Sequence, residues 1–120
     1  MFDKFSLRLT EEEKLEKQIV IDALKARYRE YRDPWGFNID TVTEAFDYVY
    51  PVYKKYFKVR VFGKENVKDE PYILASNHTG QVPIDGMMIT TAFATEMEKP
   101  RMLHSMVDTF LAGFPFLGSL

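Results

Sequence analysis

The chain has 120 residues, of which 46% are hydrophobic and 28% charged, which is enough for one globular domain with a buried core but short for an α/β enzyme. Its formal net charge of -2 excludes the overall basic bias expected of a general nucleic-acid binder, so we expect no nucleic-acid partner. The absence of cysteine excludes disulfides and thiolate metal sites and favours a cytoplasmic protein, and because no apolar run approaches the roughly 18 residues of a membrane span, any membrane contact is expected to be peripheral.

The first predicted element is a helix from Thr10 to about Arg32. The segment Thr10-Glu-Glu-Glu13 is a capping box, in which the Thr10 side chain accepts from the Glu13 amide while Glu13 reaches back. Apolar residues mark two adjoining sides of this helix: Leu15, Ile19, Ala23 and Ala26, and then Val20, Leu24, Tyr28 and Tyr31. We therefore expect a core-facing helix with one solvated side, rather than a helix that lies on a membrane. Pro34 and Gly36 then interrupt it.

A second capping box, Thr41-Val-Thr-Glu44, predicts a second helix, which Pro51 should kink. One face of this helix carries Val42, Phe46, Val49 and Tyr53. Its far end gathers tyrosines and cations: Tyr48, Tyr50, Tyr56, Lys54, Lys55, Lys58 and Arg60. Such side chains are favoured at a lipid headgroup layer, although an aromatic stripe at helical spacing also suits a core. Both interpretations stay open.

Three strands are predicted after this helix. Residues 56–62 alternate apolar and polar side chains, residues 72–75 form a short apolar run, and residues 101–106 form another short strand. Residues 63–71 read as the loop between the first two strands. A helix from Gly86 to about Glu96, with Asp85 placed to cap it, separates the second strand from the third.

This order of elements predicts an α/β fold. The strand, helix and strand of the second half should form a right-handed parallel crossover. We therefore expect an amino-terminal helical pair in residues 1–57, followed in residues 58–120 by the first half of an α/β domain with a mixed, partly parallel sheet.

The candidate catalytic residues lie in residues 72–86. This stretch changes from apolar to polar within a few residues and includes His78. In open α/β sheets, ligands bind beyond the carboxyl ends of the strands, and His78 follows such an end. Gly80 and Pro83 interrupt any continuous helix here, so a loop folded back on itself could bring the Asp85 carboxylate to one imidazole nitrogen. The other nitrogen would then be free to act as a general base.

No nucleophile accompanies this pair, since the chain lacks cysteine and Ser76 is not in a Gly-x-Ser-x-Gly elbow. A general base that deprotonates a hydroxyl of the substrate remains, and this suits direct transfer to an alcohol. Two other interpretations stay open: His78 could be a hydrogen-bonded structural residue, and Asp85 could be only a helix cap. A metal site built from His78, Asp85 and His104 is a further option that nothing in the spacing supports, so no metal is predicted.

Residues 76–86, Ser-Asn-His-Thr-Gly-Gln-Val-Pro-Ile-Asp-Gly, resemble the first motif of the glycerolipid and lysophospholipid acyltransferase superfamily, the relatives of bacterial 1-acylglycerol-3-phosphate acyltransferase. The best-known form places four residues between His and Asp. Here six residues separate them, as in a bacterial branch that reads Asn-His-Ser/Thr-Gly, then Pro, then Asp-Gly. Flanking segments are similar in the same order, so that the resemblance covers about residues 33–120: Asp33-Pro-Trp-Gly36-Phe, the aromatic helix running into residues 56–63, and Phe114-Pro-Phe-Leu-Gly118.

The resemblance implies transfer of a fatty acyl group from a coenzyme A or acyl-carrier-protein thioester to a glycerolipid or lysophospholipid hydroxyl. It implies that His78 is the general base and that Asp85 orients it. The substrate-binding positions that it implies are Asn77, Thr79, Gly80 and Gly86. No cofactor beyond the thioester substrate is implied, and the protein would be cytoplasmic and peripheral at the membrane. The alternative is a non-catalytic membrane- or lipid-associating module derived from the same fold.

Two later motifs of that superfamily have no counterpart before Leu120. They are a glycine with an apolar run ending in Asp-Arg, and a segment of the Pro-Glu-Gly-Thr-Arg type that holds the phosphate of the acceptor. We therefore expect an amino-terminal, truncated part of an acyltransferase that is inactive alone. The acyl length, the donor, the acceptor and the oligomeric state stay open.

Overall fold

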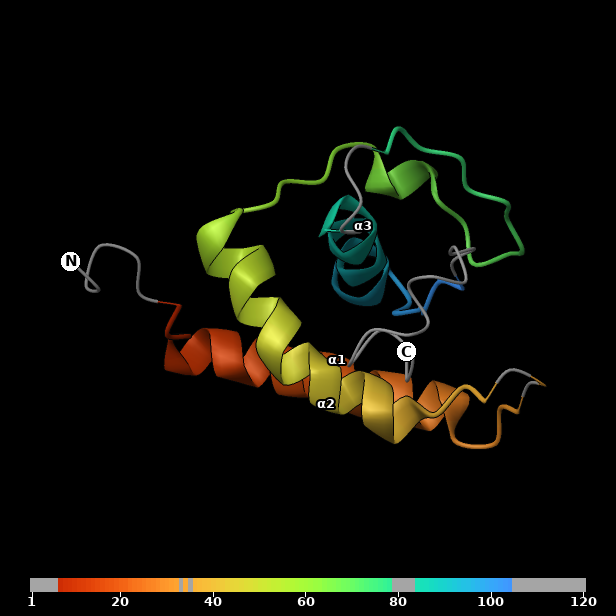
Figure 1. Ribbon diagram of the computed structural model, residues 1–120, viewed down its shortest axis with the longest axis horizontal. Helices are drawn as coiled ribbons and strands as arrows, with labels where there is room; N and C mark the ends of the chain where they lie inside the picture. The colour runs from red at the N-terminus through yellow and green to blue at the C-terminus, as the bar shows by residue number, and fades with distance from the viewer. Residues whose placement is uncertain (1–6, 33, 35, 79–83, 105–120) are drawn as a thin grey trace.

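Three α-helices make up the body of the computed structural model, which describes residues 7–32, 34, 36–78 and 84–104. They are α1 (Glu11–Tyr28), α2 (Ile39–Pro51) and α3 (Ile84–Thr95). A π-helix, η2 (Val52–Tyr56), continues α2, and a 3₁₀ turn, η3 (Lys64–Asn66), lies in the long loop that follows. Figure 1 shows α1 and α2 on one side of α3, while the loop from residue 57 to residue 78 passes around α3.

The predicted mixed sheet is wrong, because the described residues contain helices and irregular segments but no strand. Residue 56 is the last residue of η2, and residues 57–62 are irregular. Residues 71–78 are irregular throughout, and Ile73 among them is 99% exposed. The described part of the third predicted strand, residues 101–104, is irregular too. Apolar alternation reports only which side chains favour burial, whereas a strand also needs a neighbouring backbone to pair its N–H and C=O groups. No described segment supplies that pairing, so the parallel crossover is wrong as well.

Helix α1 begins as predicted. The Glu13 amide donates to Thr10 Oγ1 at 3.1 Å, and the Thr10 amide donates to Glu13 Oε2 at 2.8 Å, which is a complete capping box. The helix ends at Tyr28, before the expected Arg32. Its core-facing side is narrower than predicted, since Leu15 and Ile19 are 63% and 60% exposed. The reason is that α2 and α3 both contact the other side of α1.

Helix α2 begins at Ile39, earlier than the predicted capping box at Thr41. The Asn38 side chain accepts from the amides of Asp40 and Thr41 at 2.9 and 3.3 Å, so an earlier residue satisfies the first free N–H groups. At the other end, Pro51 is the last α-helical residue and the chain continues as a π-helix. Proline has no N–H to donate within a helix, so the regular hydrogen-bond ladder is interrupted there.

One core joins the three helices, and its buried members are Ile21, Leu24, Phe46, Tyr50 and Ala94. Tyr53 is also buried, and its hydroxyl donates to Glu96 Oε1 at 3.3 Å, which attaches η2 to the end of α3. Burial, together with the nearby Glu96 carboxylate, raises the pKa of Tyr53 to about 12. Across the residues described, no helix is both long and apolar enough to cross a bilayer.

Candidate functional site

Asp85 is the second residue of α3, so its carboxylate lies in the first turn, where the helix dipole favours negative charge. Its Oδ1 accepts the backbone N–H of Gly86 at 2.8 Å. His78 is the last described residue of the exposed segment 71–78. The two side chains come from opposite sides of residues 79–83, which lie outside the described part of the chain.

The His78 imidazole contacts the Asp85 carboxylate directly. His78 Nδ1 lies 2.8 Å from Oδ1 and 2.9 Å from Oδ2 of Asp85. A carboxylate only accepts, so Nδ1 carries the hydrogen and Nε2 of the neutral ring keeps its lone pair. The His78 side chain is 54% exposed and the Asp85 side chain 31%. A ring with a fixed tautomer and an accessible nitrogen can accept a proton from a bound molecule.

Of the other predicted site residues, the structure describes two, Asn77 and Gly86. Asn77 is exposed next to His78 in the chain. Gly86 lies in α3, and a Cβ built on it would meet no atom within 4 Å, so there is open space at this position. Thr79 and Gly80 lie outside the described residues.

His104 lies in a different environment. Its Nε2 is 3.3 Å from the Tyr31 hydroxyl, and its ring packs against the rings of Tyr31 and Phe37 at centroid distances of 5.9 and 5.6 Å. Within the described ranges, no three side chains of the metal-binding types converge. The considered site of His78, Asp85 and His104 is therefore not assembled there.

A cluster of charged residues that the sequence did not reveal lies at the far end of α3. Arg27 donates to Asp69 Oδ1 at 2.6 Å and to the Pro100 carbonyl at 3.0 Å. Arg101 donates to the Glu70 carbonyl at 2.9 Å. These contacts attach the loop before His78 and the segment after α3 to helix α1. Because Arg27 and Asp69 are 42 residues apart, no local spacing could have indicated the pair.

Comparison with known proteins defines the class to which the chain belongs. The family model described as Acyltransferase matches residues 58–120, which is more than half of the chain. The chain therefore belongs to this acyltransferase family, and the resemblance of its motif to the glycerolipid acyltransferases is confirmed.

The chain is similar in sequence to uncharacterized proteins of Mycobacterium bovis and of two strains of Mycobacterium tuberculosis. Each is 31% identical to this chain over 67 residues, which is 55% of this chain and 19% of the relative. The chain therefore matches less than a fifth of the length of these relatives. No solved structure matches it significantly.

Proposed function

We propose that this chain carries the proton-transfer part of an acyl-transfer site. In this proposal a fatty acyl group passes from a coenzyme A or acyl-carrier-protein thioester to a hydroxyl of a glycerolipid or lysophospholipid. The contact of His78 Nδ1 with Asp85, at 2.8 and 2.9 Å, is the observation that carries the proposal. Both residues lie in the segment that matches the acyltransferase family.

The proposed mechanism uses His78 as the general base. Asp85 holds the Nδ1–H and thereby orients the ring, while Nε2 removes the proton of the acceptor hydroxyl. The hydroxyl oxygen attacks the thioester carbonyl, the carbon–sulfur bond breaks, and the proton on Nε2 passes to the leaving thiolate. A thioester is already activated, so holding the two reactants together and removing one proton supply most of the catalysis.

The proposed substrate-binding positions flank this pair. Asn77 and Gly86 are the two that the structure describes, and the open space at Gly86 would let a substrate approach the first turn of α3 closely. Thr79 and Gly80 complete the proposed set from the motif alone.

The test joins the chain to the two later acyltransferase motifs, because this part is expected to be inactive alone, and measures thiol release from an acyl-thioester in the presence of lysophospholipid micelles. His78→Ala should lower the rate by about 100-fold or more, which is the usual contribution of a general base. His104→Ala is the matched control, because it removes the other histidine, whose ring packs against Tyr31 and Phe37. Nitrogen NMR of the imidazole gives a readout that needs no activity: the Nδ1–H form should dominate for His78. Equal rates for the wild type and His78→Ala would exclude the base role.

A peripheral membrane contact is a second proposal, and it also covers the alternative of a non-catalytic lipid-associating module. Directly after α2, the rings of Tyr56, Phe57 and Phe62 are 62%, 44% and 86% exposed. Lys58 and Arg60 lie between them and are exposed, and neither forms an ion pair with a described residue. Exposed rings interleaved with cations suit an anionic lipid surface.

Two of the cations near this surface already have acidic partners within the protein. Lys54 lies 3.6 Å from the Glu16 carboxylate, and Lys55 lies 2.7 Å from Glu13. Both cations already face carboxylates of α1, so their attraction to a membrane is partly neutralised. We therefore assign the lipid contact to residues 56–62.

Binding to vesicles that contain an anionic phospholipid tests this assignment. Lys58→Gln and Phe62→Ser should each weaken binding, and added salt should weaken it further. Lys25→Gln, which removes one exposed charge from α1, is the control. Binding that does not respond to salt would contradict the electrostatic part. Vesicle binding without thioester consumption, even when the later acyltransferase motifs are restored, would favour the non-catalytic alternative.

A further inference from the structure

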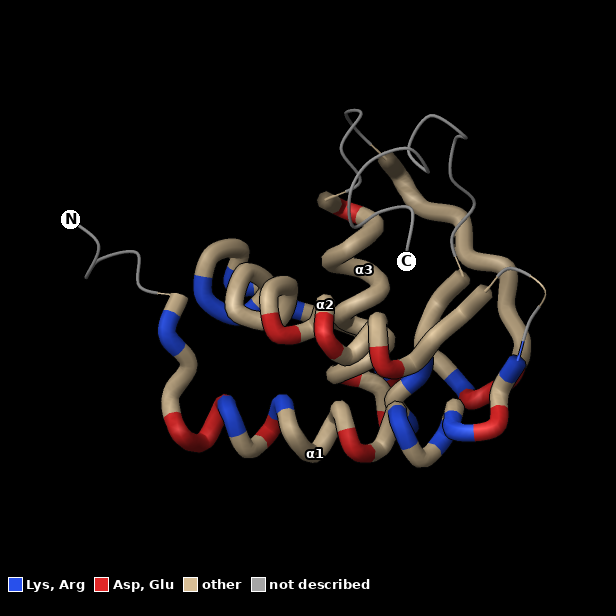
Figure 2. The backbone as a smooth tube through the Cα atoms, turned by 60° about the horizontal axis from the view of Figure 1, so that its bottom comes forward, with Lys and Arg blue, Asp and Glu red and all other residues tan. Residues whose placement is uncertain are grey.

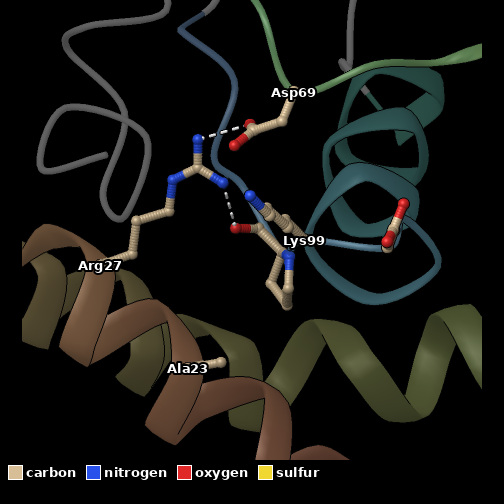
Figure 3. A pocket seen from close by; sticks show the side chains of 6 residues that line it. Ala23, Arg27, Asp69 and Lys99 are labelled. Carbon is tan, nitrogen blue, oxygen red and sulfur yellow. Dashed lines mark hydrogen bonds and ion pairs between the residues drawn. The ribbon is translucent and has the colours of Figure 1, made fainter.

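An open pocket lies at the end of α3 that is remote from Asp85. It has a volume of about 370 Å³, within the range of roughly 300 to 1,000 Å³ that is usual for ligand sites. Its lining comes from α1, from the loop before His78 and from the segment after α3: Ala23, Arg27, Asp69, Glu98, Lys99 and Pro100. Figure 3 shows Arg27, Asp69 and Lys99 directed toward one another across it.

The charges around this pocket are mixed. Arg27 and Lys99 line it, and Arg101 approaches Asp69 from the side at 3.7 Å. Two carboxylates, Asp69 and Glu98, also line the pocket, so the formal charges of its lining balance. In Figure 2 the blue and red segments crowd together beside the carboxyl end of α1. Two cations, Arg27 and Lys99, thus meet at one pocket of an acidic protein.

Asp69 acts as the internal counter-ion of this cluster. The hydrogen bond from Arg27 lowers the pKa of the Asp69 carboxyl, and the charges of Arg27, Arg101 and Lys99 lower it further. The carboxylate also holds the Arg27 guanidinium in place, at 2.6 Å. The position of the Arg27 guanidinium is therefore fixed before any ligand binds.

The cluster has more donors than its own acceptors use. Among the described residues, Lys99 makes no hydrogen bond or ion pair. The Nε of Arg101, a neighbour of Asp69 that does not line the pocket, is buried without an acceptor, so it is not counted among the donors open to a ligand. Arg27 has five N–H donors, and its described hydrogen bonds are one to Asp69 and one to the Pro100 carbonyl, while its guanidinium also lies over the Tyr28 ring. An acceptor with several oxygens and negative charge would match the remaining donors of Arg27 and Lys99.

We propose that this pocket binds a phosphate ester, with Lys99 and Arg27 as its principal contacts. A phosphate group offers several acceptor oxygens, and the planar fork of arginine and the ammonium of lysine both match it. Asp69 positions Arg27 for this contact. The site is separate from the His78–Asp85 pair, so phosphate binding here does not require that pair to be catalytic.

The position of the pocket distinguishes two sources of phosphate, and this step rests on the proposed acyl transfer. From Asp85 to the last residue of α3 is about 15 Å at 1.5 Å per residue, and Lys99 lies beyond that end. In a lysophospholipid the phosphate is a few bonds from the reacting hydroxyl. In coenzyme A a long pantetheine arm separates the phosphates from the thioester. The separation therefore fits the nucleotide end of the donor.

Isothermal titration of the chain with adenosine bisphosphate, glycerol phosphate and inorganic phosphate tests the proposal. Lys99→Gln should weaken the binding of adenosine bisphosphate by about tenfold, the loss expected for one charge-assisted contact. Arg27→Gln should weaken it at least as much. Lys25→Gln removes an equal charge from the exposed side of α1 and should leave the dissociation constant unchanged.

The outcomes separate the two proposals. Lys99 makes no described hydrogen bond or ion pair, so its variant should keep the fold, and circular dichroism checks this even if Arg27→Gln unfolds. Equal binding by Lys99→Gln and Lys25→Gln, or no binding of any probe at low salt, would overturn the site. Tighter binding of glycerol phosphate than of adenosine bisphosphate would overturn the assignment to the donor. His78→Ala should bind the nucleotide normally, whether or not His78 is catalytic.

Discussion

The Asp85 carboxylate contacts both His78 and the Gly86 N–H, and replacing Asp85 by two different residues separates these contacts. Its carboxylate faces His78 Nδ1 and also accepts the Gly86 N–H. Asp85→Asn keeps an oxygen for the Gly86 N–H but loses the negative charge. Asp85→Ala loses both. The pair of variants therefore distinguishes the orientation of His78 from the stabilisation of the first turn of α3.

Both variants should lower the stability only slightly, and Asp85→Ala should lower it more than Asp85→Asn. The His78 and Asp85 side chains are 54% and 31% exposed, and an exposed ion pair contributes about 0.2 to 1 kcal/mol. Asp85→Asn should therefore lower the free energy of unfolding by no more than about 1 kcal/mol. Asp85→Ala should lower it by a further 0.5 to 1.5 kcal/mol, roughly the net value of the hydrogen bond that the Gly86 N–H donates. Urea unfolding followed by circular dichroism measures both.

The expected effect on acyl transfer is much larger for both variants. Without the carboxylate, the His78 ring loses its fixed tautomer, and the rate should fall about 100- to 10,000-fold. Nitrogen NMR should show a mixture of tautomers for His78 in Asp85→Asn. If that variant were as active as the wild type while its imidazole stayed in the Nδ1–H form, the orienting role of Asp85 would be refuted.

Three further predictions concern the core and α3. Because burial and Glu96 raise the pKa of Tyr53 from 10.0 to about 12, its neutral form stabilises the fold below pH 10, and this contribution is lost as the pH rises through 12. Tyr53→Phe should move alkaline unfolding, followed by circular dichroism, to higher pH; an unchanged midpoint would contradict this. Leu24→Ala should lower the free energy of unfolding, measured with urea, by about 2 to 5 kcal/mol, because Leu24 is fully buried. Ile19→Ala should lower it by less than about 0.5 kcal/mol, because Ile19 is 60% exposed. Equal losses would refute the assigned core face. Gly86→Ala should stabilise α3 by about 0.5 to 1 kcal/mol, since a Cβ meets no atom there, and a lower rate of thiol release despite that gain would identify Gly86 as a point of substrate approach.

Features that depend on a few neighbouring residues were predictable. The capping box at Thr10 is confirmed because its two partners lie three residues apart. The three α-helices were predicted within a few residues of their ends. The predicted start of α2 was wrong because Asn38, which the prediction did not consider, caps the helix before Thr41 is reached.

Features that depend on distant segments were not predictable in the same way. The alternation in residues 56–62 and the apolar run at residues 72–75 are typical of strands, yet both segments are irregular in the structure. Pairing is a property of two segments, and the sequence of one cannot show whether the other is beside it. The same limit applied to α1, whose periodicity allowed two apolar sides, while the packing of α2 and α3 buried only one.

By itself, the sequence determined the positions of the helices and, through residues 76–86, the acyltransferase family, because caps, periodicity and motifs are read over short stretches. Only the tertiary structure decided which side of α1 is buried, that Asp85 contacts both His78 and the first turn of α3, and that Arg27, Asp69 and Lys99 surround one pocket. The residues of that pocket come from three separated segments. Their proximity follows from how the helices pack, which no local pattern of residues encodes.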